Sequence, residues 1–478
     1  MSSMTWLGLV PDEGPYRQSE RGHVYAAAIE FLWDAGYLYA CDCSRDEIDA
    51  RRMSAGSDTA LGYDAHCRDL GLQRSAGRAL RFKTPHEGVT VVDDLVRGNV
   101  EFPHHAMEDF VVVKSSGQPL FLLANVVDDR GMGITHVIRG EDLLPSTPKG
   151  ILLWQALNGA ATGTNSVVDF GAGAGASASA SASVNASDGA GAGTSVPLPQ
   201  FAHLPMLVNE QRKKLSKRKD PVSVESYRDS GFLSQTFRNY LALLGWSPPG
   251  GVEKVSLETL VSEFSLEQVN HAPAFFDVVK MTHMNGEYIR EMSVDEFVTA
   301  CMPWVSPSTG EWAPSNSEVP WPKDRFDDGL FRRIAPMVQE RVTLLEEVVK
   351  MVDFFFLIDP ALDASDWEVT ILANPISKEI LSLAVVAYED CEWNAQILHR
   401  VTSGIADAVG LRLGKAQAPI RVSVTGRKVG PPLFESLEIL GRNETLRRIR
   451  NALFLLDPSD DVKPGGDSTT LTRPTNTQ

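Results

Sequence analysis

The chain has 478 residues, which is too many for one hydrophobic core and predicts two to four domains. Hydrophobic residues make up 43% and charged residues 22%, as in ordinary globular proteins, and the apolar runs are too short to cross a bilayer, so we expect no membrane partner. The net charge of −17 argues, taken alone, against a nucleic-acid binder, and five cysteines are too few for a disulfide framework.

The first third of the chain alternates between helical and strand-like segments. Apolar spacing predicts a helix over 16–39 with Gly36 as its stop, followed by a loop region that contains cysteines. Residues 79–125 alternate in strand fashion, with β-rich stretches at 80–82, 89–92 and 110–113. A short strand at 135–138, a loop over 139–145 and a helix over 147–157 follow.

The remaining segments are low in complexity or helical. Residues 159–197 are almost wholly Gly, Ala, Ser, Thr and Asn, which predicts a disordered insertion in a surface loop. From about 223 onward the pattern is helical, with apolar stripes through 341–356, 377–390 and 394–409, and the Pro/Gly-rich end after 458 reads as disordered. The shift from α/β to all-helical composition puts the main boundary near 305–325.

The most informative segment is a basic turn after an apolar strand. Residues 212–219 hold six Lys or Arg in eight positions, so the acidic chain concentrates positive charge here. Lys213, Lys214, Ser216, Lys217 and Arg218 together offer point charges and a hydroxyl donor. Such a loop at the carboxyl end of a parallel strand suits a polyphosphate that gains charge in a transition state.

The segment KLSKR at 214–218 resembles the KMSKS signature of class I aminoacyl-tRNA synthetases. With that anchor, further motifs in order resemble the bacterial-type glutamyl-tRNA synthetases. They are residues 6–9, 12–21, 123–129, 136–142, 146–148, 239–246, 276–280, 419–422 and 430–441. The last motif is most similar to the actinobacterial branch.

The resemblance implies an α/β nucleotide-binding domain of the Rossmann-like class I synthetase type, incomplete at its N-terminus, followed by an α-helical anticodon-binding domain. The expected segments are a remnant of the first catalytic half (1–40), an acceptor-binding insertion (41–118), the second catalytic half (119–222), a helical stem-contact region (223–310), the anticodon-binding domain (311–457) and a disordered tail (458–478).

The resemblance also implies an activity, which is ATP-dependent ligation of L-glutamate to tRNA(Glu) through glutamyl-adenylate. ATP with Mg²⁺ would be a substrate, and the protein would be a cytoplasmic monomer. The implied site residues are Lys214, Ser216, Lys217 and Arg218 for the departing pyrophosphate, His203, Leu204, Leu207 and Lys217 for ATP, and Asn125, Arg139 and Phe121 for glutamate. Whether tRNA(Gln) is also charged stays open.

Two of these roles have structural alternatives. Arg139, a suitable bidentate partner for a carboxylate, could instead form a loop ion pair with Glu141 or Asp142. Asn125 could serve as a capping or turn residue. Phe121 stands where the family usually has a tyrosine near the substrate, so a hydroxyl contact is lost. His283 stands where a tryptophan is common.

The largest departure from the family is that no HIGH-like motif occurs anywhere in the sequence. The family has this motif before the region of Trp6, so we expect that the natural start lies upstream or that the chain is a fragment. A non-catalytic tRNA-binding remnant is the alternative function. A relative that attaches glutamate to a tRNA nucleoside is disfavoured, because such enzymes lack the helical domain expected at 311–457.

Three of the five cysteines lie close together in the sequence. Cys41, Cys43 and Cys67 have a spacing that can converge on a tetrahedral zinc ion. Some members of the resembled family hold zinc at this place, and Tyr63 would then be the fourth ligand, with His66 or Asp69 as alternatives. The other interpretation is three free thiols in an insertion that folds without metal.

A second basic group lies near the C-terminus. Its members are Arg442, Arg447, Arg448 and Arg450, and the expected anticodon-binding domain also holds Arg421, Arg427 and Lys428. They would either meet RNA phosphates or cover a solvated surface.

Overall fold

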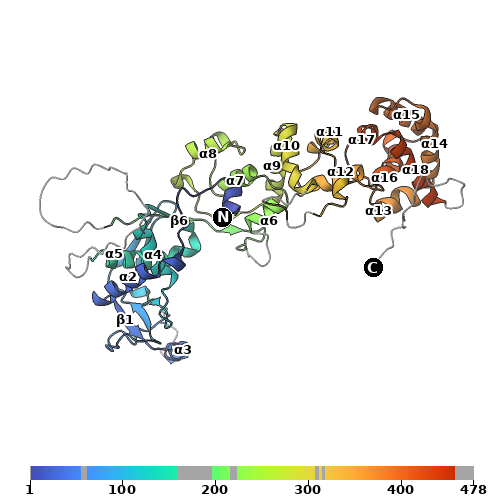
Figure 1. The fold of residues 1–478 in the computed structure, drawn as a ribbon. Helices are drawn as coiled ribbons and strands as arrows, with labels where there is room; N and C mark the ends of the chain where they lie inside the picture. The colour runs from blue at the N-terminus through green and yellow to red at the C-terminus, as the bar shows by residue number, and fades with distance from the viewer. Residues whose placement is uncertain are drawn as a thin grey trace. The chain divides into compact units, whose positions relative to one another are not determined.

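The structure is a computed structural model that describes residues 2–54, 62–159, 196–215, 223–306, 312–314 and 318–457. The predicted insertion at 159–197 and the predicted tail at 458–478 therefore fall almost wholly outside the described residues. The chain divides into two compact units (Figure 1). We call residues 9–215 with 241–276 the α/β unit, and residues 1–8, 216–240 and 277–478 the helical unit.

The α/β unit is built from strands with helices between them. Its strands are β1 (Leu38–Cys41), β2 (Ala79–Phe82), β3 (Val89–Asp94), β4 (Gly98–Pro103), β5 (Val111–Val113), β6 (His136–Gly140), β7 (Gln200–Leu204), β8 (Leu207–Val208) and β9 (Ala274–Phe275). Its α-helices are α2 (Gly22–Asp34), α3 (Arg45–Ser54), α4 (Phe121–Gly131), α5 (Thr147–Leu157) and α8 (Leu257–Glu263), with short 3₁₀ turns that include η3 (Glu141–Ser146).

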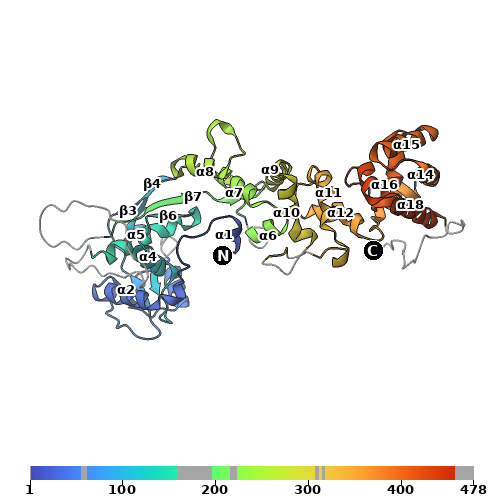
Figure 2. The same cartoon turned by 45° about the horizontal axis from the view of Figure 1, so that its top comes forward.

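Two larger sheets organise this unit. One is antiparallel, in the order β1-β2-β5, and the other has the order β4-β3-β7-β6 (Figure 2). Within the second sheet β3 pairs antiparallel with β4, whereas β7 pairs parallel with both β3 and β6. Strands β8 and β9 form a separate parallel pair. The parallel pairing of β7 with β6 brings the carboxyl ends of both strands to one edge, as a nucleotide-binding α/β fold requires.

The helices of the α/β unit bury apolar stripes that the sequence largely predicts. The predicted 147–157 helix agrees with α5, and the predicted 16–39 helix is shorter, as α2. Residues of α2, α4 and α5 share one core with the β1-β2-β5 sheet. The strand prediction for 79–125 is wrong at its end, because residues 121–125 begin α4. A continuous apolar run does not distinguish a strand from a buried helix.

The helical unit is a succession of α-helices with one π-helical turn. They are α1 (Ser2–Trp6), α6 (Val224–Asp229), α7 (Ser234–Leu243), α9 (Val278–Glu291), α10 (Val294–Val305), α11 (Asp328–Gln339), α12 (Glu347–Phe356), α13 (Ala364–Trp367), the π-helical turn η7 (Glu368–Leu372), α14 (Ser377–Asp390), α15 (Ala395–Ala408), α16 (Leu413–Thr425), α17 (Leu433–Leu440) and α18 (Arg442–Leu456).

Two hydrophobic cores stabilise this unit. The first spans residues from Leu233 to Phe356, so it crosses the expected 310/311 border, and the second lies among α13 to α18 (Figure 1). The predictions at 377–390 and 394–409 agree with α14 and α15. The prediction of one helix through 341–356 is wrong at its start, because residues 340–346 form a turn. Val342 and Leu345 lie in that turn and are buried, so their spacing resembles that of a helical stripe.

In the part of the chain that the structure describes, no single helix has the length and apolar composition to cross a membrane. Two consecutive helical segments, 364–372 and 377–390, together have the length and composition of a membrane span, but they are bent by 86° at the break between them. Their residues Ile371, Ile380 and Leu381 are fully buried in the second core of the helical unit.

Candidate functional site

Arg139 lies on β6 and is held by two neighbours rather than by a carboxylate. In the parallel pairing of β6 with β7, Arg139 stands opposite His203. Its Nη2 donates to Thr147 Oγ1 at 2.8 Å, and its Nε donates to His203 Nε2 at 3.3 Å. The structure shows neither of the loop ion pairs considered for Arg139, because Glu141 pairs with Arg97 and Asp142 pairs with Lys214.

Asn125 and Arg139 line the same small cleft. Its lining is Leu122, Asn125, Val126, Asp129, Val137, Arg139, Thr147, Gly150, Trp154, Leu198, Pro199 and Phe201. Asn125 Nδ2 donates to Asp129 Oδ2 at 3.1 Å, one turn further along α4, so Asn125 is not a helix cap. Phe121 is 58% exposed at the first turn of α4, also one turn from Asn125. The fold thus brings together polar side chains from α4, β6 and α5.

The cleft is electrostatically unusual because a carboxyl group and a guanidinium share it. Burial raises the pKa of Asp129 to about 6, and the positive charge of Arg139 offsets only part of this increase. Burial also lowers the pKa of Arg139, which the nearby Asp129 carboxylate partly opposes. A mixed pair of this kind suits a ligand that carries both a carboxylate and an ammonium group.

His203 is predicted to contact ATP, and the structure shows how its side chain is held. Its side chain is completely buried, with Nδ1 2.5 Å from Asp94 Oδ2 and Nε2 2.9 Å from Thr147 Oγ1. Because protein groups occupy both ring nitrogens, this side chain has no atom to offer a nucleotide. The predicted ATP contacts Leu204 and Leu207 lie further along the chain and are both half-buried.

The start of the basic loop is a tight turn anchored by Asn209. Asn209 Oδ1 accepts from the N–H groups of Gln211 and Lys213, each at 3.1 Å, and Lys214 forms an isolated β-bridge with Val208. The exposed Lys214 Nζ lies 2.9 Å from Asp142 Oδ2, and this hydrogen bond lowers the pKa of Asp142. Ser216, Lys217 and Arg218 lie outside the described residues.

The three clustered cysteines converge as the sequence predicts. The Sγ atoms of Cys41, Cys43 and Cys67 lie within 4.8 Å of one another. Tyr63 is buried beside them, with its hydroxyl 3.4 Å from Cys41 Sγ and 3.0 Å from the Cys67 N–H. His66 is exposed.

Two guanidinium groups lie against the cysteine sulfurs. Arg51 Nη2 is 3.2 Å from Cys43 Sγ, and Arg81 Nε is 3.3 Å from Cys41 Sγ. In spite of its burial, hydrogen bonds from Tyr63 and Arg81 lower the pKa of Cys41, whereas burial raises the pKa of Cys67 to about 11. The thiolate is the form of cysteine that binds metal.

The C-terminal basic group is mostly engaged within the protein. Arg448 is 2% exposed and donates to backbone carbonyls, so it is not available to RNA phosphates. Arg447 pairs with Asp359 and Glu444, and Arg427 pairs with Asp353. Arg448 is therefore also not part of a solvated surface, because its side chain is buried inside the protein.

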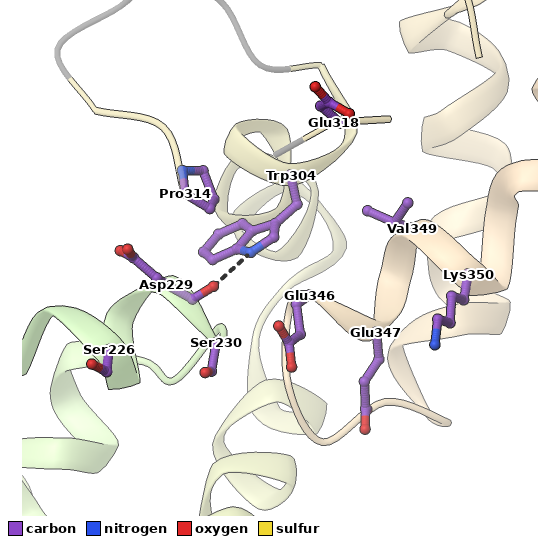
Figure 3. Close-up of a pocket in the computed structure, with 10 residues that line it drawn as sticks. All are labelled: Ser226, Asp229, Ser230, Trp304, Pro314, Glu318, Glu346, Glu347, Val349 and Lys350. Carbon is purple, nitrogen blue, oxygen red and sulfur yellow. Dashed lines mark hydrogen bonds between the residues drawn. The ribbon is translucent and has the colours of Figure 1, made fainter. Parts of the chain in front are cut away.

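A wider pocket of about 580 Å³ lies within the helical unit (Figure 3). Its lining includes Asp229, Glu318, Glu346 and Glu347, and Trp304 Nε1 donates to the Asp229 carbonyl at 3.4 Å. Four carboxylates repel a polyphosphate or an RNA backbone, so this pocket is a poor candidate for either ligand.

The sequence did not predict a role for three residues that line the cleft or lie in the hydrogen-bond network behind it. They are Asp94, Asp129 and Thr147, of which Asp129 and Thr147 stand inside quoted motifs. Asp94 ends a strand on the predicted insertion, more than 100 residues before His203, and no local signal connects the two.

Family comparisons cover nearly the whole chain. Residues 1–165 and 193–283 match the model described as tRNA synthetases class I (E and Q), catalytic domain, and residues 296–453 match the model of an anticodon binding domain.

Individual relatives agree with this assignment. A glutamate–tRNA ligase of Frankia casuarinae is 46% identical over 454 residues, covering 95% of this chain and 86% of the relative. One from Salinispora arenicola is 45% identical over 455 residues, covering 95% and 87%. Among solved structures, a glutamate tRNA ligase from Elizabethkingia meningosepticum in complex with its amino acid is similar at 26% identity. Its TM-score is 0.69, over 96% of this chain and 89% of that chain.

Proposed function

The chain belongs to the glutamate–tRNA ligases of the class I synthetases, and from this premise we propose how its residues perform the reaction. The protein ligates L-glutamate to tRNA(Glu) at the expense of ATP. The glutamate carboxylate attacks the α-phosphate of ATP, pyrophosphate leaves, and the terminal ribose hydroxyl of tRNA then displaces AMP from glutamyl-adenylate. The protein's task is to orient these reactants and to stabilise phosphate charge.

We assign glutamate to the cleft of Asn125, Asp129 and Arg139. A carboxylate on Arg139 and an ammonium near Asp129 would satisfy both charges of an amino acid, and Asn125 has both donor and acceptor atoms. The observation that supports this assignment most is that these three residues line one cleft. Phe121, one turn from Asn125, would offer an apolar edge.

We assign the pyrophosphate to the basic loop. Lys214 is the described member of the set, and Ser216, Lys217 and Arg218 follow it directly in sequence. Lys214 is paired with Asp142, so binding of pyrophosphate would exchange that carboxylate for a phosphate. Leu204 and Leu207 would contact the adenine.

A charging assay tests this function. The protein should attach labelled glutamate to tRNA(Glu) with ATP present, and failure to do so would overturn the proposal. Arg139→Ala should raise the KM for glutamate by about 100-fold, because a charge-assisted hydrogen bond is lost, while the KM for ATP changes less than about twofold. An unchanged glutamate KM in Arg139→Ala would remove Arg139 from the substrate site.

Nothing favours the alternative of a non-catalytic tRNA-binding remnant. Both the catalytic and the anticodon family models match. A cytoplasmic location and a monomeric state remain expectations of the family.

We also propose a structural zinc ion at Cys41, Cys43 and Cys67. Three convergent sulfurs are the donor set of a closed structural zinc site, and Tyr63 is the nearest candidate for the fourth ligand. Zinc would supply a cross-link between β1 and the loop that holds Cys67, in a region with a small core of its own.

Metal analysis checks the zinc site. The purified protein should carry about one zinc per chain. Cys43→Ser should lower that content, whereas the matched change Cys391→Ser, at a half-exposed cysteine of the helical unit, should leave it unchanged. Equal zinc content in both variants, or none in the parent protein, would favour the interpretation of free thiols.

A further inference from the structure

A buried chain of hydrogen bonds leads from Arg139 away from the cleft. It runs from the guanidinium to Thr147, from Thr147 to His203, and from His203 to Asp94. The exposed fractions of Thr147, His203 and Asp94 are 1%, 0% and 2%, so the chain is shielded from water along its whole length. Its members come from α5, β7 and β3, which pack together in this unit.

The donors and acceptors in this chain determine which ring nitrogen of His203 carries the proton. A guanidinium can only donate, so His203 Nε2, which receives Arg139 Nε–H at 3.3 Å, must carry a lone pair. His203 is therefore neutral, and its Nδ1–H donates to Asp94 Oδ2 at 2.5 Å. Thr147 Oγ1 accepts from Arg139 Nη2 at 2.8 Å, and its hydroxyl proton has two possible acceptors, His203 Nε2 at 2.9 Å and the Leu143 carbonyl at 3.4 Å.

Asp94 is itself firmly held. Its Oδ1 accepts from the backbone N–H groups of Val96 at 3.0 Å and Arg97 at 2.9 Å, and its carboxylate also accepts from the His203 N–H. The terminal anchor of the chain is thus bonded to the backbone of the turn between β3 and β4 and to that of β7. A series of hydrogen-bonded side chains that is anchored in this way restricts the rotamers of every member.

Two of the three nitrogens of Arg139 are used by this chain. Nε and Nη2 face His203 and Thr147, and Nη1 has no hydrogen-bond partner among the described residues. Arg139 and Thr147 line the cleft, whereas His203 and Asp94 lie behind them. The guanidinium is therefore oriented before any ligand arrives, with one nitrogen left to meet it.

We propose that Thr147, His203 and Asp94 are positioning residues that hold the Arg139 guanidinium in its substrate-binding direction. This inference rests on the proposed role of Arg139 in binding glutamate. It assigns His203 to the support of the amino-acid site, through Arg139, instead of to direct contact with ATP. Without the chain, Arg139 would sample other rotamers, and each productive encounter would cost conformational entropy.

Two substitutions of His203 distinguish its hydrogen bonds to Thr147 and Arg139 from its hydrogen bond to Asp94. Gln has its terminal amide at about the distance of Nε2 and offers an oxygen to Thr147 and Arg139. Asn keeps only a donor near Nδ1, toward Asp94. We expect His203→Asn to raise the KM for glutamate by about tenfold or more, with a KM for ATP within about twofold of the parent protein, and His203→Gln to recover part of this loss.

A second pair keeps the test valid if His203 variants fold poorly. Thr147→Val removes the hydroxyl at nearly constant volume and should raise the glutamate KM about tenfold, whereas Thr147→Ser should restore it. The matched control is Thr402→Val, because Thr402 is equally buried in the helical unit and hydrogen-bonded to Tyr388 at 2.6 Å. That control should lower thermal stability without changing either KM.

The outcomes distinguish this inference from the proposed function. If Arg139→Ala raises the glutamate KM but Thr147→Val and His203→Asn do not, Arg139 binds glutamate without help and the positioning role is overturned. If Thr147→Val raises the KM for ATP as much as that for glutamate, the chain has only a structural role. If Arg139→Ala itself leaves the glutamate KM unchanged, the proposed function of Arg139 has failed first.

Discussion

In the cleft, the carboxyl group of Asp129 has a pKa far from its ordinary value. Burial raises its pKa from 3.8 to about 6, so the folded protein binds this proton more tightly than the unfolded chain does. A raised carboxyl pKa contributes stability that is fully present below pH 3.8 and is lost as the pH rises through 6. At neutral pH the ionised Asp129 therefore lowers the stability of the fold.

The change Asp129→Asn tests this behaviour. The variant should unfold at higher urea concentration than the parent protein above pH 6, with a gain on the order of 1–3 kcal/mol. The gain should shrink steadily from pH 7 to pH 5 as the carboxyl of the parent protein becomes protonated. Urea titrations at several pH values measure it. A difference between Asp129→Asn and the parent protein that stays the same at every pH would contradict the buried-carboxyl argument.

At the scale of elements, the break between α11 and α12 depends on one glycine. Gly231 has φ +91° and its carbonyl accepts from Leu345 N–H at 3.1 Å, so the 340–346 turn packs against it. A Cβ at Gly231 would lie 2.4 Å from Leu345 N and 2.6 Å from Glu346 N. Both atoms are backbone, so a side chain has no room.

We expect Gly231→Ala to lower the free energy of unfolding by more than about 3 kcal/mol, because it adds a steric clash to the cost of a left-handed residue. The control is Gly410→Ala, at φ +68° with open space around the position, which should cost only about 1–2 kcal/mol. Chemical denaturation followed by tryptophan fluorescence measures both. Equal losses would mean that the turn moves aside easily.

At the scale of the whole molecule, the helical unit depends on a buried arginine that connects its two cores. Arg448 donates to the carbonyls of Phe354 at 2.8 Å and Leu357 at 2.9 Å, beside the first core, and to Val424 at 2.8 Å in the second. Glu444 accepts from its Nε at 2.7 Å and balances its charge. Burial lowers the pKa of Arg448, which the Glu444 carboxylate opposes.

Arg448→Met should therefore destabilise the helical unit by about 3–5 kcal/mol, because three carbonyls and a carboxylate lose their buried donor. The exposed Arg332, which pairs with Asp328 and Asp295, is the matched control, and Arg332→Met should cost less than about 1 kcal/mol. Urea denaturation distinguishes the two. A small loss in Arg448→Met would show that apolar contacts alone join the cores.

From the sequence alone, one could predict the local elements and the family. The helices at 147–157 and 377–390 follow from apolar periodicity, because a helix of that length needs one continuous buried stripe. The cysteine cluster and the partnership of Asn125 with Arg139 follow from motifs. These features depend on residues close together in the chain or on a recognised family pattern.

Only the tertiary structure decided the roles that depend on distant contacts. The burial of His203 against Asp94, the turn at 340–346 and the internal role of Arg448 each join segments far apart in sequence. Periodicity reports which side of an element is apolar but not which distant group completes its hydrogen bonds. A buried histidine and an exposed ligand have the same letter in the sequence, and the packing of β3, β7 and α5 determines which one this protein has.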